Sequence, residues 1–173
     1  SGTNITGANF YFDASNGTGS GGSGGLIFRT AATGNGGSGS DTISIGSKTT
    51  ASSSNTNSFS FSHDSGSASN KLLIVQVTTH GSVTSSSVTY GGTAMTLAGR
   101  AIHPYSSMTV ETWYLVAPTS GSNSVAVNMS NWGAITVTAI NIGNVNQSTP
   151  IGTVASTTGS NTTPTVTATS ASG

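Results

Sequence analysis

The chain of 173 residues has a formal net charge of +0, and charged residues make up 5% of it, against about 25% in an ordinary soluble domain. The composition offers no basic patch that could follow phosphates, so it excludes a nucleic-acid-binding role. No apolar run approaches the length that spans a bilayer, and the absence of cysteine excludes disulfides and thiolate metal sites. Because a chain without net charge has little electrostatic resistance to association, we expect this one to work inside an assembly.

Residues 1–46 predict a glycine-rich region of short strands that serves as a shaft or an attachment segment. Three apolar triplets recur there at nearly equal spacing, separated by runs of Gly and Ser: Phe10-Tyr11-Phe12, Leu26-Ile27-Phe28 and Ile43-Ser44-Ile45. Strands this short cannot bury an apolar face alone, so we expect them to stack on successive repeats or on equivalent strands of other copies. A flexible linker is the alternative, which the regular return of aromatic residues disfavours.

The next segment, residues 47–58, consists mainly of Ser, Thr and Asn and predicts a linker or a long surface loop. Residues 59–173 then predict a denser β domain, because short islands rich in Val, Ile, Thr and aromatic residues alternate with clusters of Gly, Ser and Asn. Residues 71–78 carry apolar side chains on both faces, as in a strand that is buried on both sides. Residues 88–97 predict a hairpin whose turn is a pair of glycines.

The second half of this domain continues the pattern. Residues 110–116 are the most aromatic predicted strand, and residues 125–129 alternate apolar and polar side chains, which predicts one wet face. In residues 134–142 the apolar positions change from one face to the other, so we expect a β-bulge there. A last strand is expected at residues 165–169. The number and spacing of these strands predict an all-β fold, a β-sandwich of jelly-roll type.

Several stretches resemble known surface proteins. Residues 24–34, GGLIFRTAATG with flanking glycines, resemble segments of bacteriophage tail-fibre and tail-spike proteins. Residues 88–97 (VTYGGTAMTL), 110–118 (VETWYLVAP) and 140–153 (INIGNVNQSTPIGT) resemble a β-sandwich module of phage and bacterial surface proteins. In that module further strands follow the stretch that is similar to residues 166–173. Either a neighbouring chain completes the sandwich by adding a strand, or the sequence is part of a longer protein.

The resemblance implies a non-enzymatic structural or contact protein on a virion surface, in a tail fibre, a spike or a head decoration. Its implied partners are further copies of the chain, commonly in a homotrimer or a larger assembly, other virion proteins, and a glycan or protein of the host surface. Partners are also expected from the strand edges, which lysine commonly protects, because the chain has just Lys48 and Lys71 for that purpose. The alternatives are a bacterial or archaeal cell-surface adhesin or extracellular filament subunit, and a carbohydrate-binding head or carbohydrate-active enzyme.

Side chains that could carry chemistry are sparse. The four acids lie on four separate segments: Asp13, Asp41, Asp64 and Glu111. A glycosidase needs two carboxylates about 5 to 9 Å apart, and nothing in this spacing brings two together. We expect Glu111 either at the wet end of its strand or paired with a cation such as Arg100. His63 and its neighbour Asp64 are expected in a solvated loop, without a second histidine at metal-binding spacing. We therefore predict no catalytic residue, no cofactor and no metal site.

Three residues are candidates for surface contact: His103, Tyr105 and Trp132. His103 and Tyr105 flank a proline, and a loop that carries histidine and tyrosine can stack on a sugar or meet a partner protein. A plain turn is the alternative at that position. Trp113, in the middle of a strand, is expected in the core. Trp132 lies in an Asn-Trp-Gly turn and is either an exposed contact residue or a lid over the sandwich.

Overall fold

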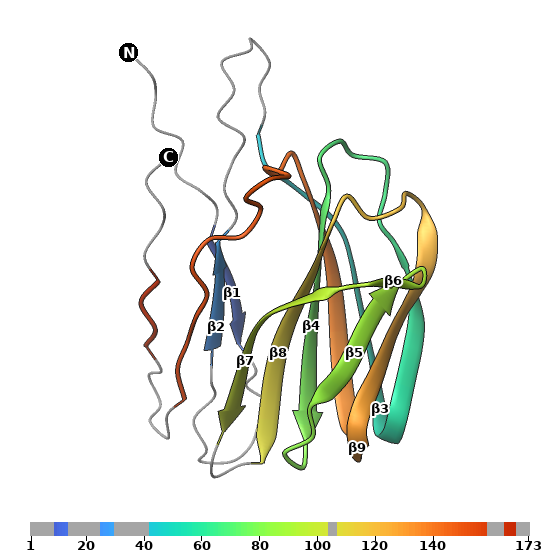
Figure 1. Cartoon of the computed structure of the whole chain (residues 1–173), viewed down its shortest axis with the longest axis vertical. Helices are drawn as coiled ribbons and strands as arrows, with labels where there is room; N and C mark the ends of the chain where they lie inside the picture. The colour runs from blue at the N-terminus through green and yellow to red at the C-terminus, as the bar shows by residue number, and fades with distance from the viewer. Residues whose placement is uncertain (1–8, 14–24, 30–41, 104–106, 159–164, 169–173) are drawn as a thin grey trace.

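The computed structural model describes residues 9–13, 25–29, 42–103, 107–158 and 165–168. Within these ranges the fold is all-β and contains no helix (Figure 1), as the composition predicts. The strands are β1 (Asn9–Asp13), β2 (Gly25–Arg29), β3 (Ser44–Asp64), β4 (Leu72–His80), β5 (Ser85–Tyr90), β6 (Thr93–Ala94), β7 (Thr96–His103), β8 (Met108–Val116), β9 (Ser122–Gly143) and β10 (Ala155–Ser156). They form a three-stranded sheet, in the order β1-β2-β10, and a seven-stranded sheet; the strand pairs of both are antiparallel.

The two longest strands, β3 and β9, pair with each other along their lengths, and both fold back midway (Figure 1). The His63 ring nitrogen Nδ1 lies 2.9 Å from the Thr49 hydroxyl oxygen, although a straight strand would hold these residues about 45 Å apart. The strand therefore bends between them, where its register with β9 shifts between Ser53 and Ser58. We call residues 44–53 the first arm of β3 and residues 58–64 its second arm.

The remaining strands make the large sheet nearly closed. On the other side of β9 from β3, β5 pairs with the first half of β9 and β4 pairs with the second half. β8 and then β7 follow β4. β6 pairs with β5, β7 pairs with β8, and Met95 alone separates β6 from β7. The strand order therefore returns from β7 through β6 to β5, while β3 pairs with β9 and with no other described strand.

The turn between β5 and β6 is the predicted glycine hairpin. Tyr90 pairs with Thr93 across it, and the two residues between them, Gly91 and Gly92, have φ angles of 55° and 81°. Positive φ at both central residues is the requirement of a type I′ turn, whose twist matches the twist of the strands that it joins. The prediction of a two-residue glycine turn is confirmed.

The main hydrophobic core lies between the two halves of the folded sheet. It is built from inward-facing side chains of β4, β5, β8 and both halves of β9, together with two residues from the adjoining loops: Leu73, Val75, Val77, Val83, Val88, Tyr90, Met95, Trp113, Val125, Val127, Met129, Ile135, Val137 and Ala139. Phe59 and Phe61 of the second arm of β3 are half-buried against it. Trp113 is a core residue, as predicted. In the stretch 125–129, Asn128 is exposed between buried apolar neighbours, which confirms the predicted one-sided strand.

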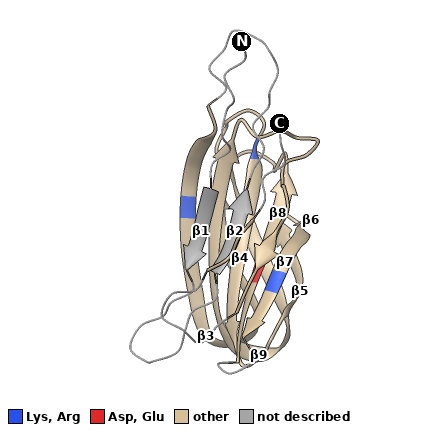
Figure 2. Ribbon diagram, turned by 90° about the vertical axis from the view of Figure 1, so that its left-hand side faces the viewer, with Lys and Arg blue, Asp and Glu red and all other residues tan. Residues whose placement is uncertain are grey.

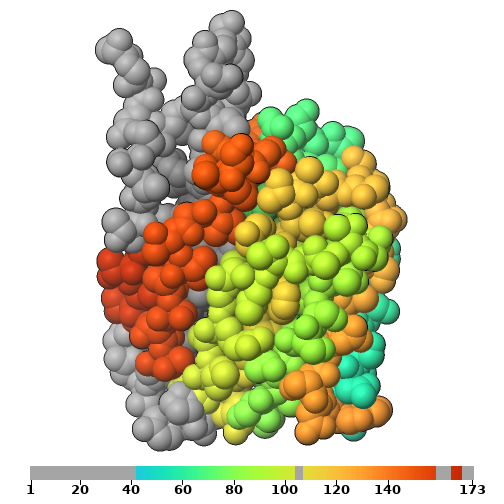
Figure 3. Space-filling view, in the orientation of Figure 1, coloured from blue at the N-terminus to red at the C-terminus, as the bar shows by residue number. Residues whose placement is uncertain are grey.

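A second, smaller apolar cluster lies on the outer face of the half that β4, β8 and the end of β9 form. Its buried members are Leu72, Ile74, Ile142 and Val145. β4 is therefore covered on both faces, as the sequence predicts. β10 pairs with β2 and contacts β7, and the segment that leads to it from β9 runs over the surface beside β7 (Figure 3).

Two sequence predictions about the middle of the chain were wrong. Residues 47–58 are not a linker, because they lie inside β3. The bulge expected at residues 134–142 is absent from the ladder between β9 and β4, whose register is continuous there. The apolar positions change face because Ile135 belongs to the main core whereas Ile142 belongs to the outer cluster. Opposite this part of β9, the extra residue lies in β3, between Ile45 and Lys48.

The two ends of the chain are less regular than the sequence predicts. The first two apolar triplets lie in β1 and β2, which pair directly with Tyr11 opposite Ile27, whereas the third leads into β3 of the other sheet. The glycine runs between the triplets lie outside the described residues. Residues 165–168 do not form the expected strand, although Val166 is half-buried and its neighbours are exposed, as an inward-facing residue would be.

Candidate functional site

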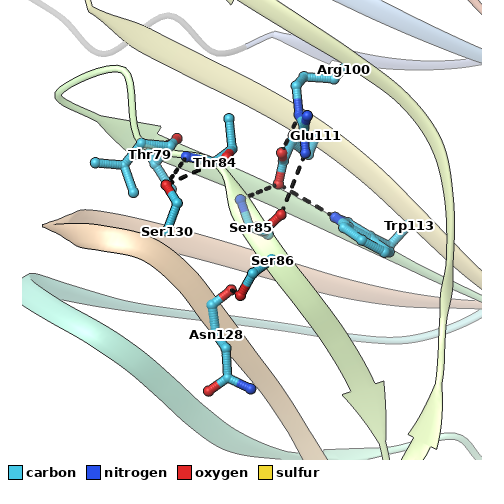
Figure 4. A network of polar contacts seen from close by, with 10 residues as sticks. Thr79, Thr84, Ser85, Ser86, Arg100, Glu111, Trp113, Asn128 and Ser130 are labelled. Atoms are coloured by element: carbon cyan, nitrogen blue, oxygen red, sulfur yellow. Dashed lines mark hydrogen bonds and ion pairs between the residues drawn. The ribbon is translucent and has the colours of Figure 1, made fainter.

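The acid Glu111 of β8 is buried, with 1% of its surface exposed. Arg100 of β7 donates from Nε to Glu111 Oε1 at 2.5 Å, and the backbone N–H of Ser85 in β5 donates to Oε2 at 2.9 Å. The indole nitrogen of Trp113 lies 3.5 Å from the same Oε2 atom. Arg100 Nη2 also donates to the carbonyl oxygen of Ser85 at 3.4 Å (Figure 4). The predicted pairing of Glu111 with Arg100 is confirmed.

This network lies at the seam where the sheet returns from β7 to β5. No ladder joins those two strands, so Arg100 and Ser85 connect them through the carboxylate of Glu111. Next to it, Ser86 Oγ donates to the carbonyl oxygen of Asn128 at 3.1 Å, which ties β5 to β9 (Figure 4). Because both carboxylate oxygens already accept hydrogen bonds from the chain, the arrangement fixes Glu111 as a structural acceptor.

His63, in the second arm of β3, is buried with 1% of its surface exposed, so the expectation of a solvated loop was wrong. Its Nδ1 lies 2.9 Å from Thr49 Oγ1, and its Nε2 lies 3.2 Å from Asn141 Oδ1. The amide nitrogen of Asn141 donates to the carbonyl oxygen of Asp64 at 2.7 Å, which leaves Oδ1 as the acceptor. The ring therefore donates from Nε2 and accepts the Thr49 hydroxyl at Nδ1.

Tyr90 extends this polar cluster toward the end of the folded sheet that lies away from the bends of β3 and β9. Its hydroxyl oxygen lies 2.7 Å from the carbonyl oxygen of Gly121 and 3.0 Å from that of His63, and it accepts the backbone N–H of Ser65 at 3.2 Å. The Tyr90 and His63 rings meet edge to face, with centroids 6.4 Å apart. The hydroxyl group thus joins the hairpin of β5 to the end of β3 and to the loop before β9.

Lys71 contributes a buried ammonium group at the same end of the molecule. It is 6% exposed, and its Nζ donates to Gly66 O and to Ser120 Oγ, both at 2.8 Å. A buried lysine cannot protect a strand edge from pairing, which leaves Lys48, exposed on β3, as the one lysine placed to do so in the described part of the chain. The sparse charges of the described residues are visible in Figure 2.

The buried position of His63 predicts a pH dependence of stability. Desolvation lowers the pKa of His63 below 6.5 and outweighs the hydrogen bond that the ring donates to Asn141 and the charge of Asp64, which raise it. Below pH 6.5 the unfolded chain therefore binds more protons than the folded chain. We expect the free energy of unfolding to be steady above that value and to fall as the pH drops toward the lowered pKa of the folded state. Urea titrations across this interval, on wild type and on His63→Gln, measure the effect.

The His63→Gln variant is the matched control for this dependence, because it keeps His80 and His103. We expect the loss of stability on acidification to be clearly smaller in the variant than in the wild type. An equal loss in both proteins would mean that His63 is not the group that couples folding to protons.

Trp132 lies at the opposite end of the fold, at the midway bend of β9, and is 60% exposed. The side-chain oxygen of Asn131 accepts the backbone N–H of Trp132 at 2.9 Å. Behind it, Gly133 packs against the end of β4, because a Cβ at this position would lie 2.9 Å from the carbonyl oxygen of His80. Of the two alternatives for Trp132, the lid is wrong and the exposed position is correct. We call Asn131–Gly133 the Trp132 tip.

The other two candidates for surface contact do not join Trp132. His103 ends β7, pairs with Met108 of β8 and is buried at 8% exposure, so its prediction as a surface contact was wrong. Tyr105 lies outside the described residues.

The described residues contain no group of three or more His, Cys, Asp or Glu side chains that could hold a metal ion. In the same part of the chain no helix has the length and apolar character needed to cross a membrane. Comparison with protein-family models, with curated proteins and with solved structures finds no match to this chain.

Proposed function

We propose that the chain is a non-enzymatic structural and contact protein of a virion surface, in a tail fibre, a spike or a head decoration. In this role the folded sheet is a β-sandwich of jelly-roll type that projects from the particle, and residues 1–46 are its shaft or attachment region. The resemblance of residues 24–34 to tail-fibre segments supports the setting. The exposed Trp132 tip carries the contact role, because the buried groups Glu111 and His63 serve contacts within the fold.

An exposed tryptophan at a tightly packed bend of a strand suits recognition of a surface. The indole ring offers a large apolar face that can stack on a sugar ring or enter a protein pocket, and such residues dominate binding energies at interfaces. Gly133 packs the bend of β9 closely against the end of β4 and the loop after it, which limits the conformational freedom that is lost on binding. Asn131, which directly precedes Trp132 in the sequence, adds an amide group. A glycan or protein of the host surface is the partner that fits this chemistry.

A carbohydrate-binding head is the second candidate function, and the adjacency of Trp132 and Asn131 favours it. The alternative assignments, a cell-surface adhesin or an extracellular filament subunit, depend on the same physical features of the sheet. The genes beside the coding sequence discriminate between these settings, because capsid and tail genes support the virion and secretion genes support the cell surface.

Immunogold electron microscopy tests the virion assignment directly. Particles are collected from a culture that produces the chain and are labelled with an antibody raised against the full chain. We expect gold on the particle surface, at fibres, spikes or head decorations. Gold confined to the cell envelope or to cellular filaments would contradict the virion assignment and favour the adhesin or filament subunit.

The contact role predicts that Trp132→Ala weakens binding without unfolding the protein. Loss of a central aromatic contact weakens binding by about thirtyfold or more, whereas truncation of an exposed side chain changes stability by about 0.5 kcal/mol or less. A glycan array with the labelled full chain, followed by titration of any glycan that binds, measures the first quantity, and urea unfolding measures the second.

The matched control is Ile45→Ala, which truncates another exposed apolar side chain, 65% exposed, near the start of β3. We expect this variant to bind as the wild type does. Equal glycan binding by Trp132→Ala and the wild type would refute the tip as the contact site. Release of cleaved sugar from the array by the wild type would refute the non-enzymatic assignment.

A further inference from the structure

The outer edge of β3 is the longest strand edge that lacks a partner among the described residues. β3 runs from Ser44 to Asp64, pairs with β9 on one side and meets no described strand on the other. An unpaired edge presents a row of backbone N–H and C=O groups that can template pairing with another chain. The strand contains no proline, and Lys48 and Asp64 are its two formally charged residues. Among the described residues the edge is therefore open to pairing, with Lys48 as its one lysine.

Because β3 folds back, its two arms lie opposite each other at the same height along the strand direction. Thr49 of the first arm contacts the ring of His63 in the second arm at 2.9 Å. The hydroxyl group of Ser47 donates to the carbonyl oxygen of Asp64. Lys48, which lies between Ser47 and Thr49, is therefore at the height of Asp64, and the bend near Thr56 lies halfway between them. The edge thus consists of two antiparallel segments of matching height, one in each half of the sheet.

We propose that β3 pairs along this edge with β3 of a second copy of the chain, antiparallel and about a two-fold axis that passes through the bend. Such an axis places the first arm of one copy beside the second arm of the other, because the arms run in opposite directions. Identical edges can pair in this isologous way, in which each contact occurs twice. The pairing is independent of what the Trp132 tip binds.

Because the two arms of β3 are at the same height, the register of this pairing is fixed. Lys48 of one copy lies opposite Asp64 of the second copy, and Thr50 lies opposite Ser62. Lys48 is paired with Ile140 of β9, and Asp64 with Ser122, so both charged side chains stand on the outer face of their half of the sheet. The two charges of the strand therefore become complementary neighbours, twice per dimer. The net charge of the chain adds no repulsion between the copies.

The inward-facing side chains also match in size across this register. Phe59 and Phe61 are half-buried at the β3 side of the main core, with ring centroids 6.0 Å apart. The register places Phe61 of the second copy opposite Ala51, and Phe59 opposite Ser53. Small residues opposite large ones leave room for the rings, and the second copy extends the core past β3 and covers the exposed parts of both phenyl groups.

Cross-linking between two single-cysteine variants tests the register, because the natural chain has no cysteine. Lys48→Cys and Asp64→Cys are purified separately, mixed and treated with a short bismaleimide. We expect covalent dimer mainly in the mixture, since directly opposite Cβ atoms lie about 5 Å apart, whereas two copies of residue 48 lie in opposite halves of the sheet, about 10 Å apart and facing away from each other. The control mixture pairs Lys48→Cys with Ser86→Cys, an exposed position on β5.

Charge reversal tests the same contact without a cross-linker. Lys48→Asp places like charges opposite each other twice per dimer. We therefore expect the dissociation constant of the dimer, measured by analytical ultracentrifugation, to rise about tenfold. The double variant Lys48→Asp with Asp64→Lys restores complementary charges and should return the dimer to wild-type strength. Absence of covalent dimer in the Lys48→Cys and Asp64→Cys mixture, with both variants folded by circular dichroism, would overturn the proposal. So would equal cross-linking in the Ser86→Cys control mixture.

Discussion

The Glu111→Ala variant is expected to lose about 3 kcal/mol of unfolding free energy. Removing one partner of a buried ion pair costs about 3 to 5 kcal/mol because it leaves the other groups unsatisfied. Here the side chain of Arg100 is 34% exposed and regains water, which places the loss at the lower end of that range. The backbone N–H of Ser85 and the indole N–H of Trp113 lose their acceptor as well. Urea unfolding followed by tryptophan fluorescence measures the loss.

A double-mutant cycle separates the ion pair from simple loss of volume. Arg100→Leu, Glu111→Leu and the double variant are compared with the wild type. We expect the double variant to lose less unfolding free energy than the sum of the losses in the two single variants. A coupling energy near zero would mean that the carboxylate does not hold the seam between β7 and β5. Fold retention in all three variants is checked by circular dichroism.

The second large effect is expected at the bend of β9, where Gly133→Ala should lower the unfolding free energy by about 2 kcal/mol. A Cβ at Gly133 would lie 2.9 Å from the carbonyl oxygen of His80 and 3.2 Å from Cγ2 of Val83. The first of these neighbours is backbone, so relief requires the end of β4 to move away from the bend of β9. Overpacking of this kind costs about 1 to 3 kcal/mol. Thermal and urea unfolding measure the change.

Asn55→Ala is the matched control, because Asn55 is exposed at the corresponding bend of β3. We expect it to change the unfolding free energy by about 0.5 kcal/mol or less. If Gly133→Ala were as stable as Asn55→Ala, the close approach of the β9 bend to the loop after β4 would not contribute to the fold.

The sequence predicts most strands because their inward-facing residues are large and apolar. The alternation of residues 125–129 and the glycine pair of the β5–β6 hairpin are local signals, and both are confirmed. β3 escaped prediction because its first arm faces inward with Thr49, Ala51 and Ser53, whose partners on β9 are apolar. Small side chains at every inward position conceal the period of two that identifies a strand. The fold-back joins residues that no local pattern could relate.

The buried polar groups were predictable to different degrees. The pairing of Glu111 with Arg100 follows from their neighbouring strands, and the sequence offered few other cations. His63 was missed because its partners, Thr49 and Asn141, come from the other half of the folded sheet and are distant in sequence. The exposure of Trp132 depends on where β9 bends, and the Asn-Trp-Gly turn identified that place without deciding which side the ring would face.

Multi-angle light scattering of the full chain at micromolar concentration tests the central claim most directly. If further copies of the chain complete its uncharged β segments by pairing with the open edge of β3, the measured mass is at least twice that of one chain. It then falls with dilution toward the mass of one chain. A single species with the mass of one chain at every concentration would contradict the account, because no second copy would then pair with the edge of β3.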